Sequence, residues 1–480
     1  MKIVVTESTD IRKQGRRLDA SYHASDGVQI LKHLHQWANA NQSQSSEVLK
    51  TSELLARRLD TLAEVCQPDG LFIPGRFKRT YVDTPEHGVP YLTGGSILQA
   101  NPTEGTKFLS RKYTAKLDRL ALHEHMILIT CSGTIGNTVY VNKLFENTVG
   151  SPDLIRVLAD SHKIESGYLY AFISSSIGRA LIQQKTYGAV VPHIEAHHVA
   201  DLPIPRLEPV LESRIHQLVE QAAELRVRAS EQLETSKKRF QKEVLGLDRD
   251  IKWQYRHEHA FTVDVATFSK PLQRLDAFHY VGYVGEAEKF VRDPTHLGEL
   301  VKAYQPTLFK RPYTGENGIP FLSGVDLYDA YPKPRMYISR KLRNIKTYQV
   351  ESGTILIQRV GQRYGLFGRP VILSRHLDKV AVSEHLIRLY TENKNERGYI
   401  YVWLSTEFGR RLVLKDSFGT SMGVLSEKSI EGAIIPKCSA ELRHSFEPEI
   451  EQLCTWRDQA NRLEDQAQAL LKEALGLLQE

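Results

Sequence analysis

Two long stretches of the chain place apolar residues at a regular spacing of three and four positions. The first covers 209–247 and contains no Gly or Pro between Pro209 and Gly246. The second covers 446–477 and keeps the same rhythm. This spacing gives a helix one apolar stripe, which has to be covered by a partner. We predict two helices of about forty residues, each roughly 60 Å long, that pack on each other.

The rest of the sequence combines short strand-like runs with a second, shorter helical pattern. The runs 126–130 and 354–358 are β-prone and bounded by Gly, Pro, Asn and Ser, which is typical of strands and turns. GYLYAFISSSIGRALI (167–182) and GYIYVWLSTEFGRRLV (398–413) instead carry apolar residues at helical spacing. Each predicts one amphipathic helix that lies on a small sheet.

These two helical segments belong to a repeat that covers the chain. They share seven of sixteen residues, and their starts are 231 positions apart. Most other matches keep an offset between 228 and 232, except the first, at 257. The matches, in order, are RLDA (17–20 and 274–277), GVPYLTGG and GIPFLSGV (88–95 and 318–325), FLSRKY and YISRKL (108–113 and 337–342), ILITCSGTIG and ILIQRVGQRYG (127–136 and 355–365), SPDLIRVL and SEHLIRLY (151–158 and 383–390), and EVLGL and EALGL (243–247 and 473–477). The chain therefore contains two copies of one unit.

The duplication predicts the fold class. We expect an α/β (α+β) chain, with two similar mixed globular domains separated by an antiparallel coiled coil of the two long helices and related by a pseudo-two-fold axis. The antiparallel arrangement follows from connectivity, because the first helix leads into the second globule and the second helix returns. In the alternative, each helix packs only on its own globule. The predicted boundaries are 1–206 and 249–437 for the domains, and 207–248 and 438–480 for the helices.

Composition narrows the class of protein. The chain has 480 residues, 41% apolar and 25% charged, without an apolar run long enough to cross a bilayer. Its start, MKIVVTESTD, is unlike a signal peptide, so we predict a cytoplasmic location and no membrane partner. The four cysteines form no CxxC pair, which argues against a disulfide framework or a zinc knuckle.

Positive charge is concentrated in two blocks. The net charge is only +6, but 301–375 contains thirteen Lys and Arg against four acidic residues. The stretch 70–119 contains eight against four. Each block is either a solvated face or a surface for an acidic partner, and the sequence leaves both interpretations open.

No motif in the chain indicates catalysis or metal binding. An adenine methyltransferase would carry Asn/Asp-Pro-Pro-Tyr/Phe and a Gly-rich cofactor turn, but Asn101-Pro102 continues as Thr-Glu and no G-x-G-x-x-G occurs. The dipeptide Gly-Lys is absent, which excludes a phosphate-binding Walker loop. A nuclease site of the PD…(D/E)xK type is also missing. His193, His197 and His198 of PHIEAHH have no ligand partners at suitable spacing, so we expect surface or packing roles.

The duplicated order of these segments, with a long helix after each copy, resembles the DNA specificity subunits of Type I restriction-modification systems. The resemblance covers nearly the whole chain. This sequence has LEPVLESRI where the family usually has a Glu-Gln pair after the exit proline, and its GT turn is intact only at Gly133-Thr134. The departures indicate a divergent branch, and the resemblance implies a setting in methylation-based phage defence.

The resemblance implies a non-catalytic subunit. Each globule would be a target recognition domain that reads one half of a bipartite target in double-stranded DNA. The helices would set the spacing and dock two DNA methyltransferase subunits, with a restriction or translocase subunit as a further partner. The chain itself would hold no cofactor. S-adenosylmethionine would bind to the partner methyltransferase, and ATP and Mg would enter only with a motor or nuclease partner.

Candidate DNA-binding residues are polar and basic side chains in predicted loops. Lys and Arg would contact phosphates, while Arg, Gln, Asn and Ser can reach base edges. The cluster QRVGQRYG (358–365) is the strongest candidate for reading bases, whereas the shared SRK favours phosphate or a structural role. The candidates are Arg76, Lys78, Arg79, Arg111, Lys112, Thr134, Asn137, Lys185 and Tyr187 in the first domain, and Lys310, Arg311, Tyr313, Arg340, Lys341, Arg359, Gln362, Arg363 and Tyr364 in the second.

Two other functions fit the same sequence. The chain could be a stand-alone DNA-binding regulator, or a scaffold that bridges proteins through its coiled coil. The charged outer positions of SKKRFQKE and WRDQANRLEDQ suit either a solvated or a docking surface. Binding of a methyltransferase would separate these alternatives from a specificity subunit.

Overall fold

The chain forms two compact units in the computed structural model, which describes residues 20–23, 25–40, 58–187, 192–249, 251, 253, 279, 282–362, 365–419 and 422–477. Unit 1 comprises Met1–Leu98, Thr106–Val227 and Gln459–Glu480. Unit 2 comprises Gln99–Gly105 and Arg228–Asp458. Of the repeated RLDA segments, only Ala20 lies within the described residues.

Unit 1 is built on two four-stranded sheets. The central sheet has the order β2-β9-β6-β7, and all its pairs are antiparallel. The small sheet has the order β3-β5-β4-β8, with β4 and β8 parallel. A separate ladder pairs β1 with β10. The strands are β1 (Arg58–Thr61), β2 (Cys66–Phe72), β3 (Tyr81–Val82), β4 (Gly88–Leu92), β5 (Lys107–Ser110), β6 (Ile127–Thr130), β7 (Thr138–Tyr140), β8 (Val149–Gly150), β9 (Leu154–Ala159) and β10 (Pro203–Arg206).

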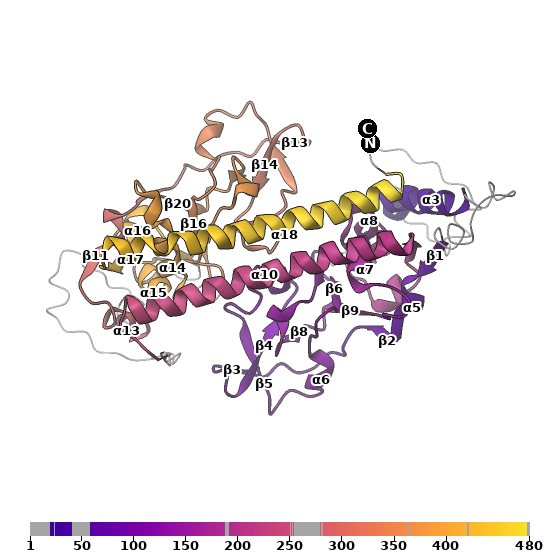
Figure 1. The fold of residues 1–480 in the computed structure, drawn as a ribbon, viewed down its shortest axis with the longest axis horizontal. Coiled ribbons are helices and arrows are strands. Elements are labelled where there is room, and N and C mark those ends of the chain that lie inside the picture. Colours follow the sequence, from indigo (N-terminus) through magenta and orange to yellow (C-terminus); the bar gives the residue numbers. More distant parts are fainter. Residues whose placement is uncertain are drawn as a thin grey trace. The chain divides into compact units, whose positions relative to one another are not determined.

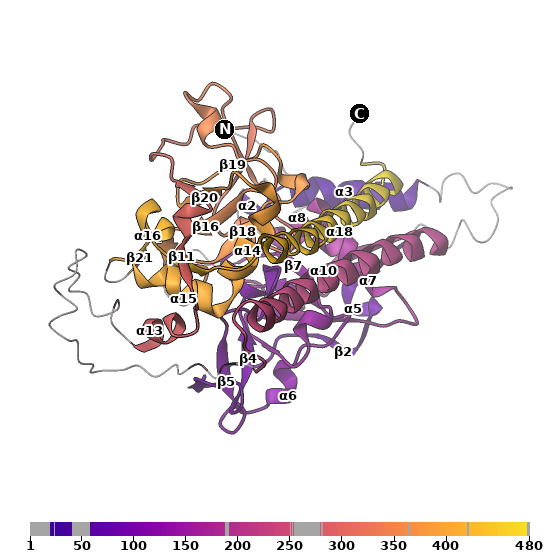
Figure 2. The same ribbon diagram turned by 60° about the vertical axis from the view of Figure 1, so that its left-hand side comes forward.

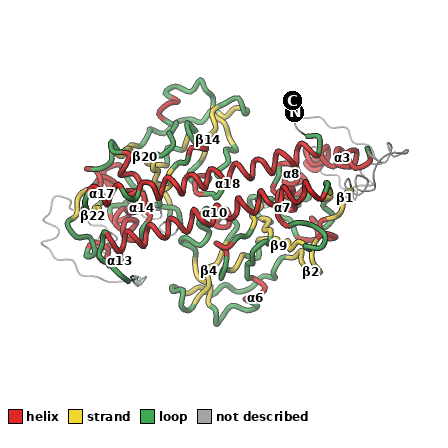
Figure 3. Tube along the Cα trace, in the orientation of Figure 1, coloured by secondary structure: helices red, strands yellow, loops and turns green. Residues whose placement is uncertain are grey.

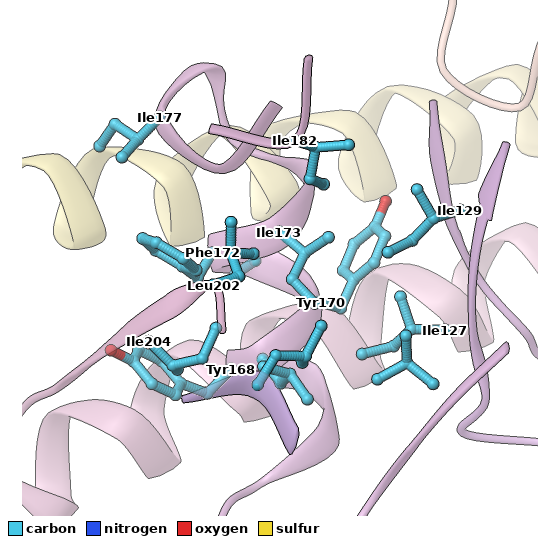
Figure 4. Packing of buried hydrophobic residues seen from close by; sticks show 14 of the residues in the cluster. Ile127, Ile129, Tyr168, Tyr170, Phe172, Ile173, Ile177, Ile182, Leu202 and Ile204 are labelled. Atoms are coloured by element: carbon cyan, nitrogen blue, oxygen red, sulfur yellow. The ribbon is translucent and has the colours of Figure 1, made fainter. Parts of the chain in front are cut away.

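The helices of unit 1 cover the central sheet. They are α2 (Ala20–His23), α3 (Asp26–Asn39), α5 (Leu62–Val65), α6 (Leu117–Leu120), α7 (Ser166–Ser174), α8 (Ser176–Gln184) and α9 (Ala196–Val199), with 3₁₀ turns η1 (Ser96–Leu98) and η2 (Lys143–Phe145). Strand β6 is buried on both faces. Its side chains alternate between the two faces, so they contribute to two clusters. Ile127 and Ile129 belong to one buried cluster with Tyr170 and Ile173 of α7 (Figure 4). Leu128 belongs to a second cluster, on the opposite face.

The segment 167–182 forms two helices, so the prediction of one amphipathic helix was wrong. The chain breaks at Ser175, whose hydroxyl accepts a hydrogen bond from the Gly178 amide and starts α8. Gly178 packs against the backbone of Phe172 and Ile173, leaving no space for a Cβ atom. The apolar spacing continues through the break because both helices face the same core.

Unit 2 repeats the topology of unit 1. Its central sheet has the order β12-β20-β16-β18 and its small sheet β13-β15-β14-β19, again with one parallel pair, β14 with β19. The ladder β11-β22 matches β1-β10, and β17-β21 is an addition. The strands are β11 (Pro294–His296), β12 (Lys302–Tyr304), β13 (Tyr313–Thr314), β14 (Ile319–Leu322), β15 (Met336–Ile338), β16 (Ile355–Gln358), β17 (Val360–Gly361), β18 (Pro370–Ile372), β19 (Ala381–Val382), β20 (Leu386–Tyr390), β21 (Gly423–Val424) and β22 (Ile434–Pro436).

The helices of unit 2 also repeat, including the break. Thr406 caps the second helix of the pair α14–α15 through the Gly409 amide, as Ser175 does in unit 1. The one-helix prediction was therefore wrong here too. The helices are α13 (Gly282–Glu288), α14 (Arg397–Ser405), α15 (Glu407–Lys415), α16 (Glu427–Glu431) and α17 (Ala440–His444), with 3₁₀ turns η3 (Leu297–Glu299), η4 (Asp326–Tyr328), η5 (Ile345–Thr347), η6 (Arg375–Leu377) and η7 (Lys394–Glu396). Figure 3 shows how loops connect these short elements.

Two long helices, α10 (Pro209–Glu243) and α18 (Glu447–Ala474), each contribute to both units (Figures 1 and 2). In unit 1, the start of α10 and the end of α18 share one core. In unit 2, the end of α10 and the start of α18 share another. Arg226 pairs with Glu464 in unit 1, and Arg239 pairs with Glu449 in unit 2, so the helices run antiparallel. The predicted mixed fold with paired long helices is confirmed.

Both long helices are shorter than predicted. At 1.5 Å per residue they span about 52 and 42 Å. The second tract starts as the separate helix α17, and α18 begins at Glu447 with Pro448 in its first turn. Proline is tolerated there but would break a helix that ran continuously from Ala440. None of the helices in the described ranges combines the length and apolar character needed to cross a membrane.

Candidate nucleic-acid interface

A five-residue segment at the edge of the small sheet is shared by the two units. It reads FKRTY at 77–81 and FKRPY at 309–313, and its tyrosine begins the edge strand β3 or β13. The rings of Tyr81 and Tyr313 are 44% and 52% exposed. Lys78 and Lys310 are exposed as well. Each unit therefore presents a lysine and an aromatic ring beside an open strand edge.

The SRK loop extends this surface in both units. Arg111 and Lys112 follow β5, and Arg340 and Lys341 follow β15, all with exposed side chains. The loops are tied to the preceding segment, because Ser110 N donates to Thr80 O over 2.8 Å and Ser339 N to Pro312 O over 2.9 Å. We name this surface the basic edge. It consists of Lys78, Tyr81, Arg111 and Lys112 in unit 1, and Lys310, Tyr313, Arg340 and Lys341 in unit 2.

The basic edge is extended by further exposed cations after a turn. Lys116 and Asn344 both adopt the left-handed conformation, with φ of 55° and 58°, which directs the chain into α6 or η5. Lys116 and Arg119 are exposed in unit 1, as are Arg343 and Lys346 in unit 2. In unit 2 Arg340 also donates to the carbonyls of Asn317 and Gly318, over 2.9 and 3.2 Å, so its guanidinium is partly used by the fold.

The arginine of the FKR segment contacts an acidic residue and an aromatic ring within its own unit. Arg79 lies 3.7 Å from Asp153 and over the ring of Tyr91 at 5.7 Å. Arg311 lies 2.7 Å from Glu384 and over Phe321 at 5.2 Å. Both candidate arginines thus connect the small sheet to the loop that precedes β9 or β20. Their charges are largely offset by these acids.

Two loops that differ in sequence between the units meet beside the basic edge. In unit 1, Cys131 N donates to Asp153 O over 3.2 Å, and Ile194 N donates to Cys131 O over 3.0 Å. These bonds join the turn after β6 to the loop after α8. In unit 2, Arg359 N donates to His385 O and Leu425 N to Arg359 O, both over 2.9 Å. We name the turn after the central strand the central turn, and the loop after the second short helix the late loop.

The central turn and late loop of unit 1 hold four sequence-predicted candidates. Thr134 is exposed. Asn137 is only 5% exposed and its side chain accepts a hydrogen bond from Arg179, so it lies inside the domain rather than on an exposed loop. Lys185 donates to both carboxylate oxygens of Asp201, over 2.9 and 2.8 Å. Tyr187 keeps 41% of its surface exposed.

Tyr187 lies between His193 and His198 in a row of four rings. Its centroid is 5.8 Å from His193 and 4.8 Å from His198, which lies 3.9 Å from His197. Its hydroxyl donates to Glu195 over 3.2 Å. Burial, helped by the neighbouring His197, lowers the pKa of His198, so this imidazole is neutral at neutral pH. In the ranges that the structure describes, no group of three His, Cys, Asp or Glu is arranged to hold a metal ion.

A cleft of about 690 Å³ opens between the histidines and the segment that follows β2 in unit 1. Arg76, Asp153, His193, Glu195 and His197 contribute to its lining. Arg76 is exposed at this position. The cleft is therefore lined by donors and acceptors of both charges, next to the row of rings.

The central turn of unit 2 differs in chemistry. Arg359 is half-buried, and its Nε donates to Leu425 O over 3.1 Å. Gln362 is exposed, while the candidates Arg363 and Tyr364 lie outside the described residues. The late loop presents Phe418 and Met422, each 49% exposed.

No protein-family model and no curated protein matches the chain. Among solved structures, the HsdS subunit from Thermoanaerobacter tengcongensis aligns over 91% of this chain and 100% of its own, at 18% identity and a TM-score of 0.28. The Type I S subunit from M. genitalium aligns over 89% and 96%, at 14% identity and a TM-score of 0.31. The chain is similar to Type I S subunits. A chain from a study of type I R-M system assembly aligns over 90% and 100%, at 17% identity and a TM-score of 0.28.

The exposed Phe418 and Met422 were not among the sequence candidates, because those were chosen as polar and basic side chains in predicted loops. The repeat contained a usable signal. Phe418 bridges to Val424 as Tyr187 bridges to His193, so the two aromatic residues occupy equivalent positions. The FKR-x-Y repeat was also missed as a repeat, although most of its residues were selected individually.

Proposed function

We propose that this chain is the sequence-recognition subunit of a restriction-modification type DNA methyltransferase complex. Each globular domain reads one half of a bipartite target in double-stranded DNA. The chain supplies no catalytic group. The bases between the half-sites are not read, and the modification takes place on partner subunits.

One observation carries this proposal: the same basic edge occurs twice, on domains of identical topology, beside loops that differ. Shared lysines and arginines suit phosphates, which every duplex presents and which supply affinity without sequence information. Loops that differ between the domains suit base edges, because the two half-sites need not be alike. A regulator of one palindromic site would need no such difference.

The partners follow from the helices. The antiparallel pair α10 and α18 contributes to both units, so we expect it to set the spacing and to dock two methyltransferase subunits. S-adenosylmethionine would bind to these partners. ATP and Mg would be required only where a restriction or translocase subunit joins the complex.

The decisive experiment is a domain exchange. Residues 1–206 are replaced by those of a related chain, and methylated positions are mapped across the genome of cells that express the hybrid. We expect one half of the methylated sequence to change and the other half to stay. The reciprocal exchange of residues 249–437 is the matched control and should change only the other half. A change in both halves, or in neither, refutes reading by separate domains.

The alternatives are separated by a second measurement. The full-length chain is used to capture a candidate methyltransferase, and the washed complex is assayed on DNA. A specificity subunit retains the enzyme and directs methylation to one sequence. A stand-alone regulator binds its DNA site without retaining the enzyme, while a scaffold retains proteins without selecting a DNA sequence.

A further inference from the structure

Unit 2 exposes two apolar side chains on its late loop. Phe418 and Met422 are each 49% exposed on the late loop. The loop is held firmly at its base, where Phe418 N donates to Val424 O over 3.0 Å and Val424 N donates to Phe418 O over 2.7 Å. Gly423 packs against the buried ring of Phe367, which leaves no space for a side chain there. Backbone hydrogen bonds therefore hold the base of the loop beside both apolar side chains.

A short ladder joins the central turn of unit 2 to this loop. Strands β17 and β21 pair Val360 with Val424 and Gly361 with Gly423. Continued by one residue, this antiparallel register would place Gln362 opposite Met422. Gln362 is exposed, so its carboxamide is available to a ligand that also covers the apolar pair.

The equivalent position in unit 1 has different chemistry. Tyr187 replaces Phe418, and its hydroxyl donates to Glu195 over 3.2 Å. His193 occupies the position of Val424. The strand pair β17-β21 is represented in unit 1 by a single bridge between Ser132 and His193. The two units therefore offer different groups to whatever lies against this surface.

This combination fits one kind of base pair. In the major groove an A·T pair shows adenine N6 and N7, which a Gln side chain can bind with two hydrogen bonds, and the thymine 5-methyl group, which takes apolar contacts. A G·C pair offers no methyl group. We propose that unit 2 reads an A·T base pair through Gln362, Phe418 and Met422, an inference that rests on the proposed function.

DNA is a better occupant than a protein partner because the surface continues into the basic edge. Arg359 N donates to His385 O over 2.9 Å, and the adjacent Glu384 pairs with Arg311 of the FKR segment at 2.7 Å. Lys310 and Tyr313 of the same segment are exposed. Cations beside the apolar pair match a ligand that carries phosphates next to its base edges.

The test uses the complex that co-purifies with the full-length chain from its host. The complex selects binders from a library of randomised duplexes, and the enriched sequences define both half-sites. Phe418→Ala and Met422→Ala should each relax the choice at one A·T position in one half-site. Gln362→Ala should relax the same position by about tenfold. Tyr390→Ala, at the end of β20 and 45% exposed in the wild-type chain, is the matched control and should change nothing.

A second measurement isolates the methyl group. Replacing that thymidine by deoxyuridine removes one methyl contact and should weaken wild-type binding by about fourfold. Binding by the Phe418→Ala variant should not respond to the same replacement. In each selection, the variant should still enrich the other half-site unchanged, which shows that the variant is folded.

The possible results are distinguishable. A bipartite motif that keeps its A·T choice in all three variants, or wild-type binding that ignores deoxyuridine, overturns the inference and leaves the proposed function intact. Loss of a co-purifying protein in the Phe418→Ala variant, with the motif unchanged, also overturns it and makes the surface a protein-docking site. Absence of any bipartite motif overturns the proposed function itself.

Discussion

At the scale of single residues, each domain buries an arginine that donates its hydrogen bonds to backbone carbonyls. Arg156 is fully buried and donates to the carbonyls of Ser151, Leu154 and Gly150, over 3.1, 2.8 and 2.8 Å. Arg388 makes the equivalent three bonds in unit 2. Burial lowers the pKa of both guanidinium groups to about 10, which still leaves them charged at neutral pH. Each arginine fixes the loop that adjoins the basic edge.

We predict that Arg156→Ala lowers the free energy of unfolding by about 3 kcal/mol, because it leaves buried carbonyls without donors and creates a cavity. Arg388→Ala should cause a similar loss. Urea denaturation followed by circular dichroism measures both. Arg119→Ala, at an exposed position, is the control and should stay within about 0.5 kcal/mol of the wild type. Losses below about 1 kcal/mol in the two buried variants would contradict this role.

A second residue-scale prediction concerns Asp329 in unit 2. Burial, strengthened by the nearby Asp326, raises the pKa of Asp329 to about 7, although Arg335 opposes the shift. Between about pH 4 and pH 7, Asp329 is therefore protonated in the folded state and ionised in the unfolded state. Asp329 makes its full contribution to the free energy of unfolding below its unfolded pKa. This contribution is lost as the pH rises through the folded pKa.

We expect the wild type to lose roughly 2 to 4 kcal/mol relative to Asp329→Asn when the pH is raised from 4 to 8. Unfolding by urea at several pH values gives this difference, and other titrating groups cancel between the two proteins. A constant difference across the range would show that Asp329 ionises normally.

At the scale of elements, the feature that sequence periodicity does not reveal is the break between paired helices. Ser175 and Thr406 stop one helix and start the next, and the glycine three residues later allows the second helix to pack against the first. The motif Ser/Thr-x-x-Gly is visible in both copies of the sequence. Its effect on the backbone depends on the helix packing that surrounds it.

We predict that Gly178→Ala and Gly409→Ala each destabilise their unit by about 1 to 3 kcal/mol, because the added methyl group collides with the preceding helix backbone. Gly95→Ala is the control, since no atom lies within 4 Å of a Cβ added there. Thermal unfolding of the three variants tests this comparison. Equal effects at all three positions would mean that close packing is not the reason for the glycines.

At the scale of the whole molecule, the two long helices each contribute to both units of the chain. Under the proposed function, helix length sets the number of unread base pairs. Insertion of seven residues after Val227 of α10 and after Asp458 of α18 keeps the apolar stripe in phase and lengthens both helices by about 10 Å. We expect the unread spacer to grow by about three base pairs, since ten base pairs span roughly 34 Å.

Methylation mapping of cells that carry the lengthened chain measures this change, and both half-sites should stay the same. Insertion into α10 alone is the control. It places the two stripes out of register, so we expect loss of stability and of methylation. An unchanged spacer in the doubly extended chain would show that the helices do not set the distance.

The sequence by itself determined the duplicated architecture, the two long amphipathic helices and the two basic blocks. These features depend on local spacing and on residue identity, so they do not depend on which tertiary contacts form. The β-prone runs bounded by turn residues also located β6 and β16 within one residue, because strand propensity and turn residues are local properties. The helical spacing overestimated the length of α18, since the restart at Pro448 was not taken into account.

Only the tertiary structure decided which polar residues are available to a ligand. Arg79, Arg311 and Asn137 were candidates of equal standing with Lys78, yet the fold pairs the two arginines with acids and buries the asparagine. It also leaves the apolar Phe418 and Met422 exposed. Exposure and pairing depend on residues that are distant along the chain, so they arise from packing and cannot be read from the order of residues alone.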